Sequence, residues 1–200
     1  GIPMRHSLEI AAVVLSLVQC GADRDAVVRI ENKQATCSGV CVSADGLILT
    51  SEHCGQGTGS KITFEGIGTF TATSVYEPPK NNIDQATLLR VKAGEPLPFV
   101  PLAKLAPQQG DQVYSIGYPG GKFARLEGRV VGNTHLNWTA TDFRAYEGHS
   151  GGPLFNAAGE LIGLASKRSL MPSEAATMPM AVDTTPYSRH VSLAFIQAAI

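Results

Sequence analysis

The chain has 200 residues, of which 44% are hydrophobic and 16% charged, and its formal net charge is −1. This balance is typical of an ordinary globular protein and lacks the basic excess of a general nucleic-acid binder. No apolar run reaches the roughly 18 residues that a membrane-spanning helix needs. The 21 glycines and 12 prolines favour turns and short strands over long helices.

Residues 1–22 allow two interpretations. The order "MRHSLE", "IAAVVLSLV", "QCGA" has the basic start, short apolar core and small-residue end of a signal peptide. Glu9 at the edge of the apolar core favours the alternative, a helix or strand that packs on the domain. A lipid anchor on Cys20 is disfavoured because the preceding Gln19 is bulky.

From residue 25 onward the pattern is that of strands and turns. Short β-branched or alternating runs, separated by glycine or proline, favour an antiparallel barrel or sandwich. The "ADG" turn predicts a hairpin that ends at Glu52-His53-Cys54. We expect two halves at about 25–92 and 108–186, a proline-containing connection at about 93–107, and a helix at about 190–200. The predicted strands are "AVVRIE", "TCSGVCVS", "LILTS", "KITF", "TFTATSVYE", "QATLLRV", "QVYSIGY", "LEGRVVGN", "HLNWTATD" and "LIGLASK".

Three residues are candidates for chemistry. His53 ends an apolar strand, Asp84 precedes another, and Ser150 lies in the loop "GHSGGP". A single histidine is more often structural, and an aspartate before a strand more often belongs to a turn. The serine loop is more specific, because its glycines can turn several amide N–H groups toward one point. A serine beside such a site becomes a nucleophile when a histidine accepts its proton.

Four motifs occur in the order expected of chymotrypsin-fold serine proteases, and the chain resembles their bacterial HtrA/Deg-like branch over about residues 25–196. The motifs are "SGVCVSADGLILTSEHC", "IDQATLLRV", "YSIGYPGG" and "GHSGGPLFNAAGELIGLAS". The resemblance implies an all-β fold of two antiparallel six-stranded barrels with the active site between them. It also implies His53, Asp84 and Ser150 as a catalytic triad, and the N–H groups of Gly148 and Ser150 as an oxyanion hole.

The chain departs from the family pattern at several points. His149 stands where digestive members carry an aspartate that receives a new N-terminal amine, so activation by N-terminal insertion is not expected. A pH-sensitive His149 is one interpretation, and an ordinary hydrogen-bonded or exposed histidine is the other. Glu52, before the histidine, is expected at the surface. We expect no PDZ-type module after the protease domain.

The resemblance also implies a disulfide that closes the histidine loop. Cys37 and Cys54 fall about where relatives form this bridge, with Cys41 as a rival partner for Cys54. A Cys20–Cys41 bridge would complete the first pairing. The alternatives are free buried thiols in a cytosolic protein, or a Cys/His metal site, which no paired C-x₂-C spacing supports. We favour an oxidising compartment, and thus a secreted or periplasmic protein.

In this fold, the substrate pocket is formed by the segment six residues before the serine and by the strand after the serine. Here these are Arg144 and, approximately, Ser166, Lys167 and Arg168. Such a basic pocket would favour acidic side chains. Alternatively Arg144 pairs with Glu147 or Asp142, and the pocket takes small aliphatic residues as in HtrA-like relatives.

The sequence therefore predicts a serine endopeptidase that acts on protein or peptide substrates without a metal or cofactor. One alternative is a pseudoprotease that keeps the fold as a protein-binding module, although a binder does not need the complete set of His53, Asp84 and Ser150. Another is an acyl hydrolase that uses the same triad on esters. No feature of the sequence indicates a nucleic-acid role, and none fixes the oligomeric state.

Overall fold

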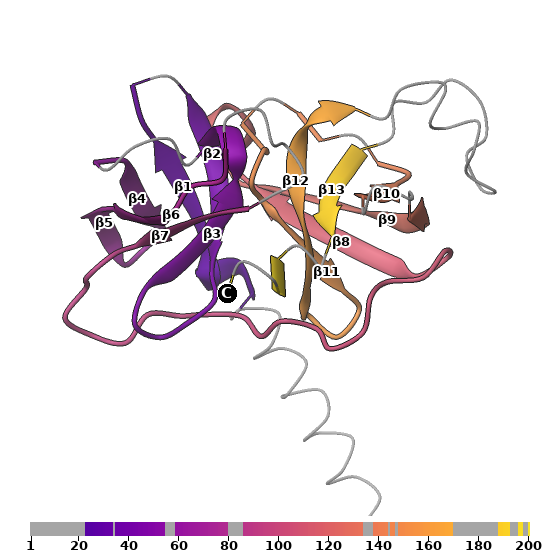
Figure 1. Cartoon of the computed structure of the whole chain (residues 1–200), viewed down its shortest axis with the longest axis horizontal. Helices are drawn as coiled ribbons and strands as arrows, with labels where there is room; N and C mark the ends of the chain where they lie inside the picture. The colour runs from indigo at the N-terminus through magenta and orange to yellow at the C-terminus, as the bar shows by residue number, and fades with distance from the viewer. Residues whose placement is uncertain are drawn as a thin grey trace, which may run out of the picture.

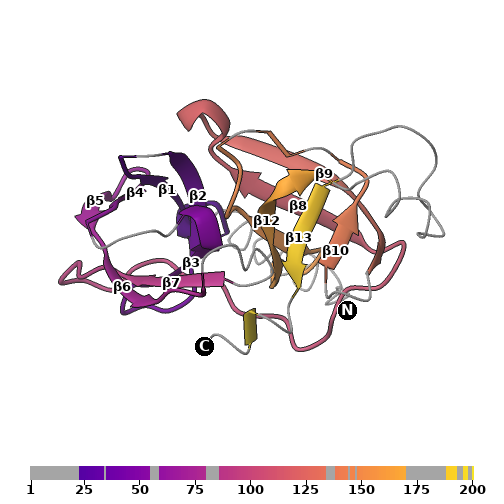
Figure 2. The same ribbon diagram turned by 45° about the horizontal axis from the view of Figure 1, so that its top comes forward.

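The computed structural model shows two β-sheet lobes that lie side by side (Figures 1 and 2). Residues 1–22, for which the sequence allows a signal peptide or a packed element, lie outside the described residues. So does Asp84. The structure describes residues 23–33, 35–54, 59–79, 86–133, 138–143, 145–146, 148–169, 188–192, 196–197 and 200.

The first lobe is a seven-stranded antiparallel sheet in the order β5-β4-β1-β2-β3-β7-β6. Its strands are β1 Val27–Glu31, β2 Thr36–Cys41, β3 Leu47–Ser51, β4 Lys61–Phe64, β5 Gly68–Thr71, β6 Thr73–Tyr76 and β7 Ala86–Arg90.

The seventh strand arises because the predicted run "TFTATSVYE" divides at Ala72. The N–H of this buried residue still donates to the carbonyl of Ser60 at 2.9 Å, which extends the register of β4 and β5 by one residue. The chain continues as β6, which pairs with β7 at the other edge of the sheet. Since one residue connects the two edge strands, the sheet must curl round on itself. The lobe is thus barrel-like, with seven strands instead of the expected six.

The second lobe is a closed antiparallel barrel in the order β10-β13-β12-β11-β8-β9, which has the expected six strands. Its strands are β8 Gln112–Gly117, β9 Ala124–Asn133, β10 Trp138–Thr141, β11 Pro153–Asn156, β12 Leu161–Ser169 and β13 Ser188–Ser192.

Two elements of this barrel differ from the sequence-based prediction. β11 was not predicted, and it begins at Pro153, directly after the glycine loop. The expected helix at about 190–200 is wrong in its first part, because Ser188–Ser192 forms β13 between β10 and β12. These pairings close the barrel, and the hydrogen bonds they supply outweigh the helical pattern of the segment.

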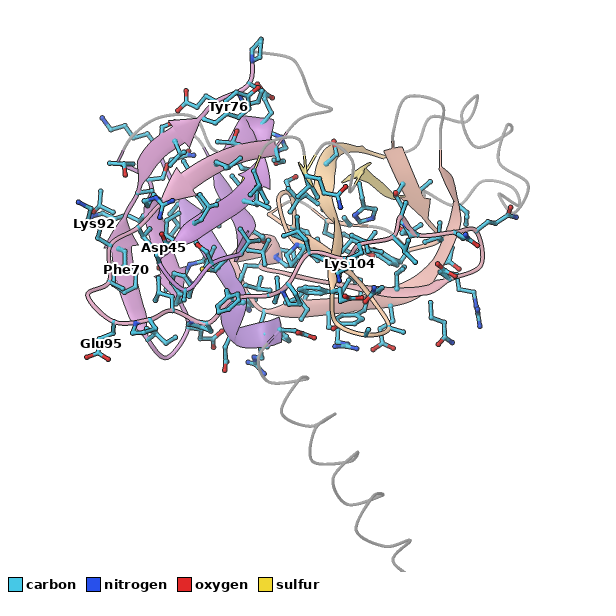
Figure 3. All side chains as sticks on the ribbon, turned by 60° about the horizontal axis from the view of Figure 1, so that its bottom comes forward. Asp45, Phe70, Tyr76, Lys92, Glu95 and Lys104 are labelled. Atoms are coloured by element: carbon cyan, nitrogen blue, oxygen red, sulfur yellow. A yellow bond between two sulfur atoms is a disulfide. The ribbon has the colours of Figure 1, made fainter. Side chains whose placement is uncertain are left out.

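The connection between the lobes runs along both of them. Leu97 N–H donates to Ala44 O and Val100 N–H to Cys41 O, at 3.0 and 3.1 Å, so its first part lies on the first sheet. Further on, Leu102 forms a parallel bridge with Leu161 of the second barrel. Charged side chains such as Lys92, Glu95 and Lys104 are on its outer face (Figure 3).

One hydrophobic core continues from the first lobe into the second. It joins side chains of both sheets, including Phe64 and Ile30 from the first and Phe155 and Leu164 from the second. A smaller cluster inside the second barrel surrounds Leu154. No helix within the described part of the chain is long and apolar enough to cross a membrane.

The start of the described chain is held against the second barrel by a buried carboxylate. Asp23, 7% exposed, accepts a hydrogen bond from the hydroxyl of Tyr114 on β8. The guanidinium of Arg125 stacks 3.9 Å above the Tyr114 ring. Burial raises the pKa of Asp23, while the Tyr114 hydrogen bond and the charge of Arg125 act in the opposite direction. These partners stabilise the carboxylate in a site where it would otherwise be costly.

We predict that Tyr114→Phe lowers the free energy of unfolding by about 1–3 kcal/mol, because it leaves the Asp23 carboxylate buried with one donor fewer. Urea denaturation would measure this difference. In an Asp23→Ala background the same substitution should have little effect, since the acceptor is then already absent. Equal losses in both backgrounds would contradict the prediction.

Candidate active site

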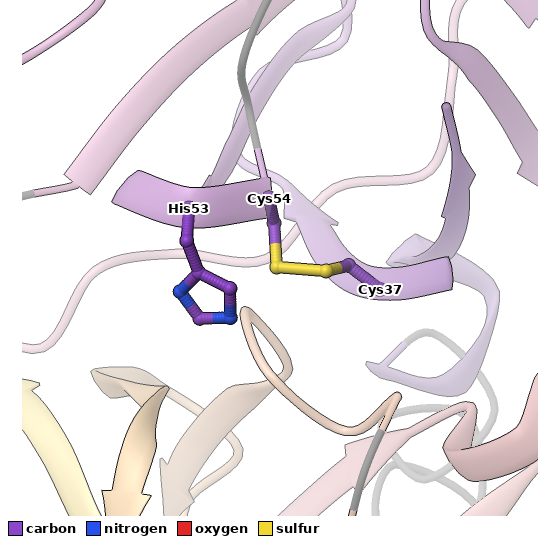
Figure 4. A group of neighbouring side chains, drawn as sticks. All are labelled: Cys37, His53 and Cys54. Carbon is purple, nitrogen blue, oxygen red and sulfur yellow. A yellow bond between two sulfur atoms is a disulfide. The ribbon is translucent and has the colours of Figure 1, made fainter. Parts of the chain in front are cut away.

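His53 lies on the short helix η1, Glu52–Cys54, which follows β3 directly. The hairpin before it depends on Gly46, whose φ of +92° belongs to the left-handed region and whose position leaves no room for a Cβ beside Val91 O. The imidazole is half-buried, with Nδ1 3.4 Å from the hydroxyl oxygen of Ser51. It points from the first lobe toward the second (Figure 4). The predicted hairpin that ends at the histidine is confirmed.

A disulfide joins Cys37 of β2 to Cys54 of η1, which confirms the expected pairing. The two Cα atoms are 5.8 Å apart, and the bridge closes a loop of sequence separation 17 that contains the whole histidine hairpin. This covalent link fixes η1 beside β2 and restricts the unfolded chain.

Cys41 carries a free, buried thiol, so the expected Cys20–Cys41 bridge is wrong; Cys20 itself lies outside the described residues. The thiol donates to Ser43 O at 3.1 Å. Burial raises its pKa to about 11, so the group remains a neutral thiol at physiological pH.

The loop around Ser150 depends on two glycines with positive φ, Gly148 at +91° and Gly151 at +83°. A Cβ on Gly151 would lie 2.1 Å from Ser38 O and 2.2 Å from Thr50 Oγ1. Only glycine therefore allows the chain after Ser150 to pass this close to the first sheet. Gly151 N–H then donates to Ala165 O of β12 at 2.8 Å, which holds the loop on the second barrel as well.

Ser38 of β2 forms two hydrogen bonds to the serine loop and one to the turn after β8. Its backbone N–H donates to Ser150 O at 2.8 Å and its hydroxyl donates to Gly148 O at 2.9 Å. The same hydroxyl oxygen accepts from the N–H of Tyr118 at 2.8 Å. The Ser38 carbonyl, in turn, accepts the hydroxyl of Thr50 at 2.7 Å. The loop, the turn after β8 and the strand before His53 are thus joined at one buried residue.

His149 is fully buried between Gly148 and Ser150. Ser115 Oγ donates to Pro153 O at 2.7 Å, so the proton of this contact lies on His149 Nε2, which donates to Ser115 Oγ at 2.7 Å. Burial lowers the pKa of His149 to about 4, and the ring is therefore neutral at physiological pH. Gly117 lies flat against the ring, where a Cβ would come 2.7 Å from Nδ1.

The other predicted site residues are placed only in part. Ser166 is buried on β12, next to Ala165, which bonds the serine loop. Lys167 and Arg168 continue the same strand. Asp84 and Arg144 lie outside the described residues. Glu52, expected at the surface, is only 7% exposed, which corrects that expectation.

Sequence reasoning missed Ser38, Thr50 and Ser115, which support the site from strand interiors. All three are buried polar residues with side-chain hydrogen bonds to backbone or histidine groups. A serine or threonine at an inward-facing position of an alternating strand could have indicated these residues. A hydroxyl group is usually buried only where it has a hydrogen-bond partner.

Comparisons with known proteins agree with this fold. The family model described as trypsin-like peptidase domain matches residues 37–164, and a second one, Peptidase S46, matches residues 4–62. The crystal structure of a serine endoprotease from Yersinia pestis superimposes with a TM-score of 0.73 at 24% identity. The superposition covers 90% of this chain and 64% of the chain from Yersinia pestis.

Two curated relatives are similar over about two thirds of the chain. Serine protease HTRA2, mitochondrial, from Bos taurus is 30% identical over 141 residues, which is 64% of this chain and 30% of the relative. A probable periplasmic serine endoprotease, DegP-like, from Hahella chejuensis is 31% identical over 147 residues, 68% of this chain and 30% of the relative. The matched region thus covers less than a third of the length of these relatives.

We predict that Ser38→Ala lowers the free energy of unfolding by about 1–3 kcal/mol, because the Tyr118 N–H and Gly148 carbonyl lose a buried partner. Urea denaturation followed by circular dichroism would measure it. Thr73→Ala is a suitable control, since its exposed hydroxyl donates to Arg90 O and its loss should change stability by less than about 0.5 kcal/mol. Indistinguishable effects of the two substitutions would refute the role assigned to Ser38.

We also predict that stability falls as pH drops below about 6.5. Burial lowers the pKa of His149 to about 4, and burial together with the nearby His149 lowers that of His190 to about 3. The unfolded chain binds protons that the folded chain does not, so each histidine should reduce stability by about 1.4 kcal/mol per pH unit in this range.

Urea denaturation at pH 7 and pH 5 would test the sign and size of this effect. Wild type should lose about 4 kcal/mol for the two histidines together, and His190→Gln should lose about half as much. A wild-type protein of unchanged stability at both pH values would show that these histidines are not buried as neutral rings.

Proposed function

The chain belongs to the family of trypsin-like peptidase domains, and we propose on this basis that it hydrolyses peptide bonds as a serine endopeptidase. The observation that carries the proposal is the attachment of the Ser150 loop to the strand that holds His53 in place. Ser150 O accepts the N–H of Ser38, and it lies 3.6 Å from the Sγ of Cys54, the residue after His53. These contacts support the proposal that Ser150 from the second lobe and His53 from the first act together as nucleophile and base.

In the proposed reaction, Ser150 Oγ attacks the scissile carbonyl while His53 accepts the hydroxyl proton. Asp84 keeps the imidazole in the required tautomer and stabilises the imidazolium. His53 then returns the proton to the leaving amine, and an acyl group remains on Ser150. A water molecule, deprotonated by His53, releases the acid product and restores the serine.

Strand register supports the role of Asp84. Ser51, two residues before His53, pairs with Ala86, and Asp84 is two residues before Ala86. Two residues of chain span at most about 7 Å. Asp84 and His53 are thus each two residues in sequence from the paired residues Ala86 and Ser51, and this proximity supports the proposed role of Asp84 beside His53.

The amides of Gly148 and Ser150 are the proposed oxyanion hole. Within the described part of the chain neither N–H donates to another protein group, whereas His149 N–H between them donates to Tyr146 O at 2.9 Å. The neutral, buried His149 ring contributes no charge to this site. Two fixed donors would stabilise the tetrahedral oxyanion, and loss of one such donor typically costs about 2.7–4 kcal/mol in the transition state.

For the substrate pocket we propose Arg144, Ser166, Lys167 and Arg168. The support is the position of Ser166, which follows Ala165 on β12, where Ala165 exchanges hydrogen bonds with Gly151 and Gly152. A side chain seated beside β12 would thus be adjacent to Ser150. A peptide library that compares acidic with small aliphatic residues before the scissile bond would define its preference.

We further propose that the protein works in a secreted or periplasmic location. The DegP-like relative is named as periplasmic, and the Cys37–Cys54 disulfide is stable in an oxidising compartment.

We predict that Ser150→Ala lowers kcat by about 10⁶-fold and abolishes labelling by a fluorophosphonate probe, since the probe reacts only with an activated serine. Peptide mapping of the labelled wild-type protein should find the modification on Ser150 alone. His53→Ala should also prevent labelling, because the serine then has no base.

Hydrolysis of matched peptide and ester substrates is the accompanying measurement. Cleavage of esters but not of peptides would favour an acyl hydrolase. A folded wild-type protein that neither labels nor cleaves would contradict the proposal and indicate a pseudoprotease.

A further inference from the structure

We propose that Cys37, His53 and Cys54 form a binding site for a soft divalent cation such as Zn²⁺ when the disulfide is reduced. Their candidate ligand atoms, one from each residue, all lie within 4.8 Å of one another (Figure 4). In the oxidised protein the two sulfur atoms are bonded to each other and offer no thiolate. The site is therefore available only in the reduced protein.

The backbone already holds the three side chains at a spacing that suits a metal. Two ligands come from η1 and one from β2, and the Cα atoms of the cysteines are 5.8 Å apart. Around tetrahedral zinc, with bonds of about 2.0–2.3 Å, neighbouring ligand atoms are roughly 3.5–3.8 Å apart. Side-chain rotation can separate the sulfur atoms and bring the imidazole nearer without moving either element. A water molecule would complete the coordination.

Burial and charge favour a metal over two free thiolates. Cys37 is 2% and Cys54 is 0% exposed, so two bare negative charges would be costly there. Zn²⁺ with two thiolates and a neutral imidazole has no net charge. In addition, the Ser51 hydroxyl donates to Cys54 Sγ at 3.2 Å, the kind of outer contact that orients and stabilises a metal ligand.

Reduction of the Cys37–Cys54 disulfide requires a reductant from outside the protein. A phosphine supplies two electrons and breaks the S–S bond, and water provides the two thiol protons and the oxygen of the resulting phosphine oxide. With a thiol reductant, two reductant thiols pass their protons to the cysteines and become a disulfide. Binding of Zn²⁺ then displaces both thiol protons to solvent, and forms two Zn–S bonds and one Zn–N bond.

The consequence for catalysis rests on the proposed function. A metal on Nε2 of His53 occupies the lone pair that would accept the Ser150 proton. A metal on Nδ1 leaves the remaining proton on Nε2, which then cannot accept another. With either nitrogen bound, His53 is no longer a base. The reduced, metal-loaded protein would be latent. A small-molecule disulfide that accepts two electrons from the two thiolates, and is itself reduced to two thiols, would close the Cys37–Cys54 bond, release Zn²⁺ and free the base.

Metal binding can be tested without any assay of activity. The full chain is reduced with a phosphine, freed of excess reagent and titrated with Co²⁺ as a spectroscopic probe, then with Zn²⁺ under equilibrium dialysis. We expect about one metal per reduced chain with a thiolate-to-cobalt charge-transfer band, and none on the oxidised chain. Far-UV circular dichroism shows whether the reduced chain is folded before and after the metal is added.

Three variants separate this site from other thiols. Cys37→Ser should abolish the charge-transfer band or weaken metal binding at least tenfold, and His53→Ala should also weaken it at least tenfold. Cys41→Ser, which removes the buried free thiol of the same sheet, should bind metal like wild type. Equal binding by the oxidised protein, unchanged binding by Cys37→Ser, or a reduced chain that stays unfolded or metal-free with Zn²⁺ would each overturn the proposal.

Measurements of peptide cleavage distinguish a failure of the metal site from a failure of the proposed protease function. If both hold, Zn²⁺ inhibits the reduced protein at least tenfold more strongly than the oxidised one, and a chelator restores activity. Metal binding to a protein that never cleaves peptides would support the site and refute the protease. Cleavage that Zn²⁺ does not affect in the reduced state would support the protease and refute the site.

Discussion

The arrangement of the site depends on the hydrogen bonds of Ser38. Its N–H, hydroxyl and carbonyl bind Ser150, Gly148 and Thr50, and its hydroxyl also receives the N–H of Tyr118. The residue belongs to the first lobe, whereas Gly148 and Ser150 belong to the loop of the second. A relative movement of the lobes would break several buried hydrogen bonds together, so the position of the loop is set by the interface and not by the loop alone.

A second constraint on the serine loop is that the buried ring of His149 within it is uncharged. His149 is buried with its Nε2 proton committed to Ser115 Oγ, and Gly117 lies against the ring. An imidazole held neutral in this way packs like an aromatic side chain and supplies one hydrogen bond. A carboxylate at the same position would need a cationic partner in the protein. This chain therefore supports the serine loop by packing of a neutral ring.

Local patterns were sufficient to predict an antiparallel barrel or sandwich and the histidine hairpin, because Gly46 marks the turn and the strands around it alternate between polar and apolar residues. The division into two barrels was implied by the family resemblance. They were not sufficient for β11, which begins at a proline beside the loop, or for β13, which pairs with strands far away in the chain. Ser38 escaped prediction for the same reason, since its hydroxyl partners are 110 and 80 residues distant. A motif in the sequence indicates candidate reacting residues, but the buried groups that support them are found only in the folded structure, where the two lobes meet.

Adjacent residues of β2 bind two different parts of the site. Successive side chains of a strand point to opposite faces, so Cys37 faces η1 and bonds to Cys54, while Ser38 faces the serine loop. A slip of one residue in the register with β1 would exchange the two faces and lose both connections. Because the two links are chemically independent, reduction of the disulfide leaves the hydrogen bonds of Ser38 intact. In the proposed metal-bound state His53 would be occupied while Ser38 still holds the loop that carries Ser150, as a reversible latent state requires.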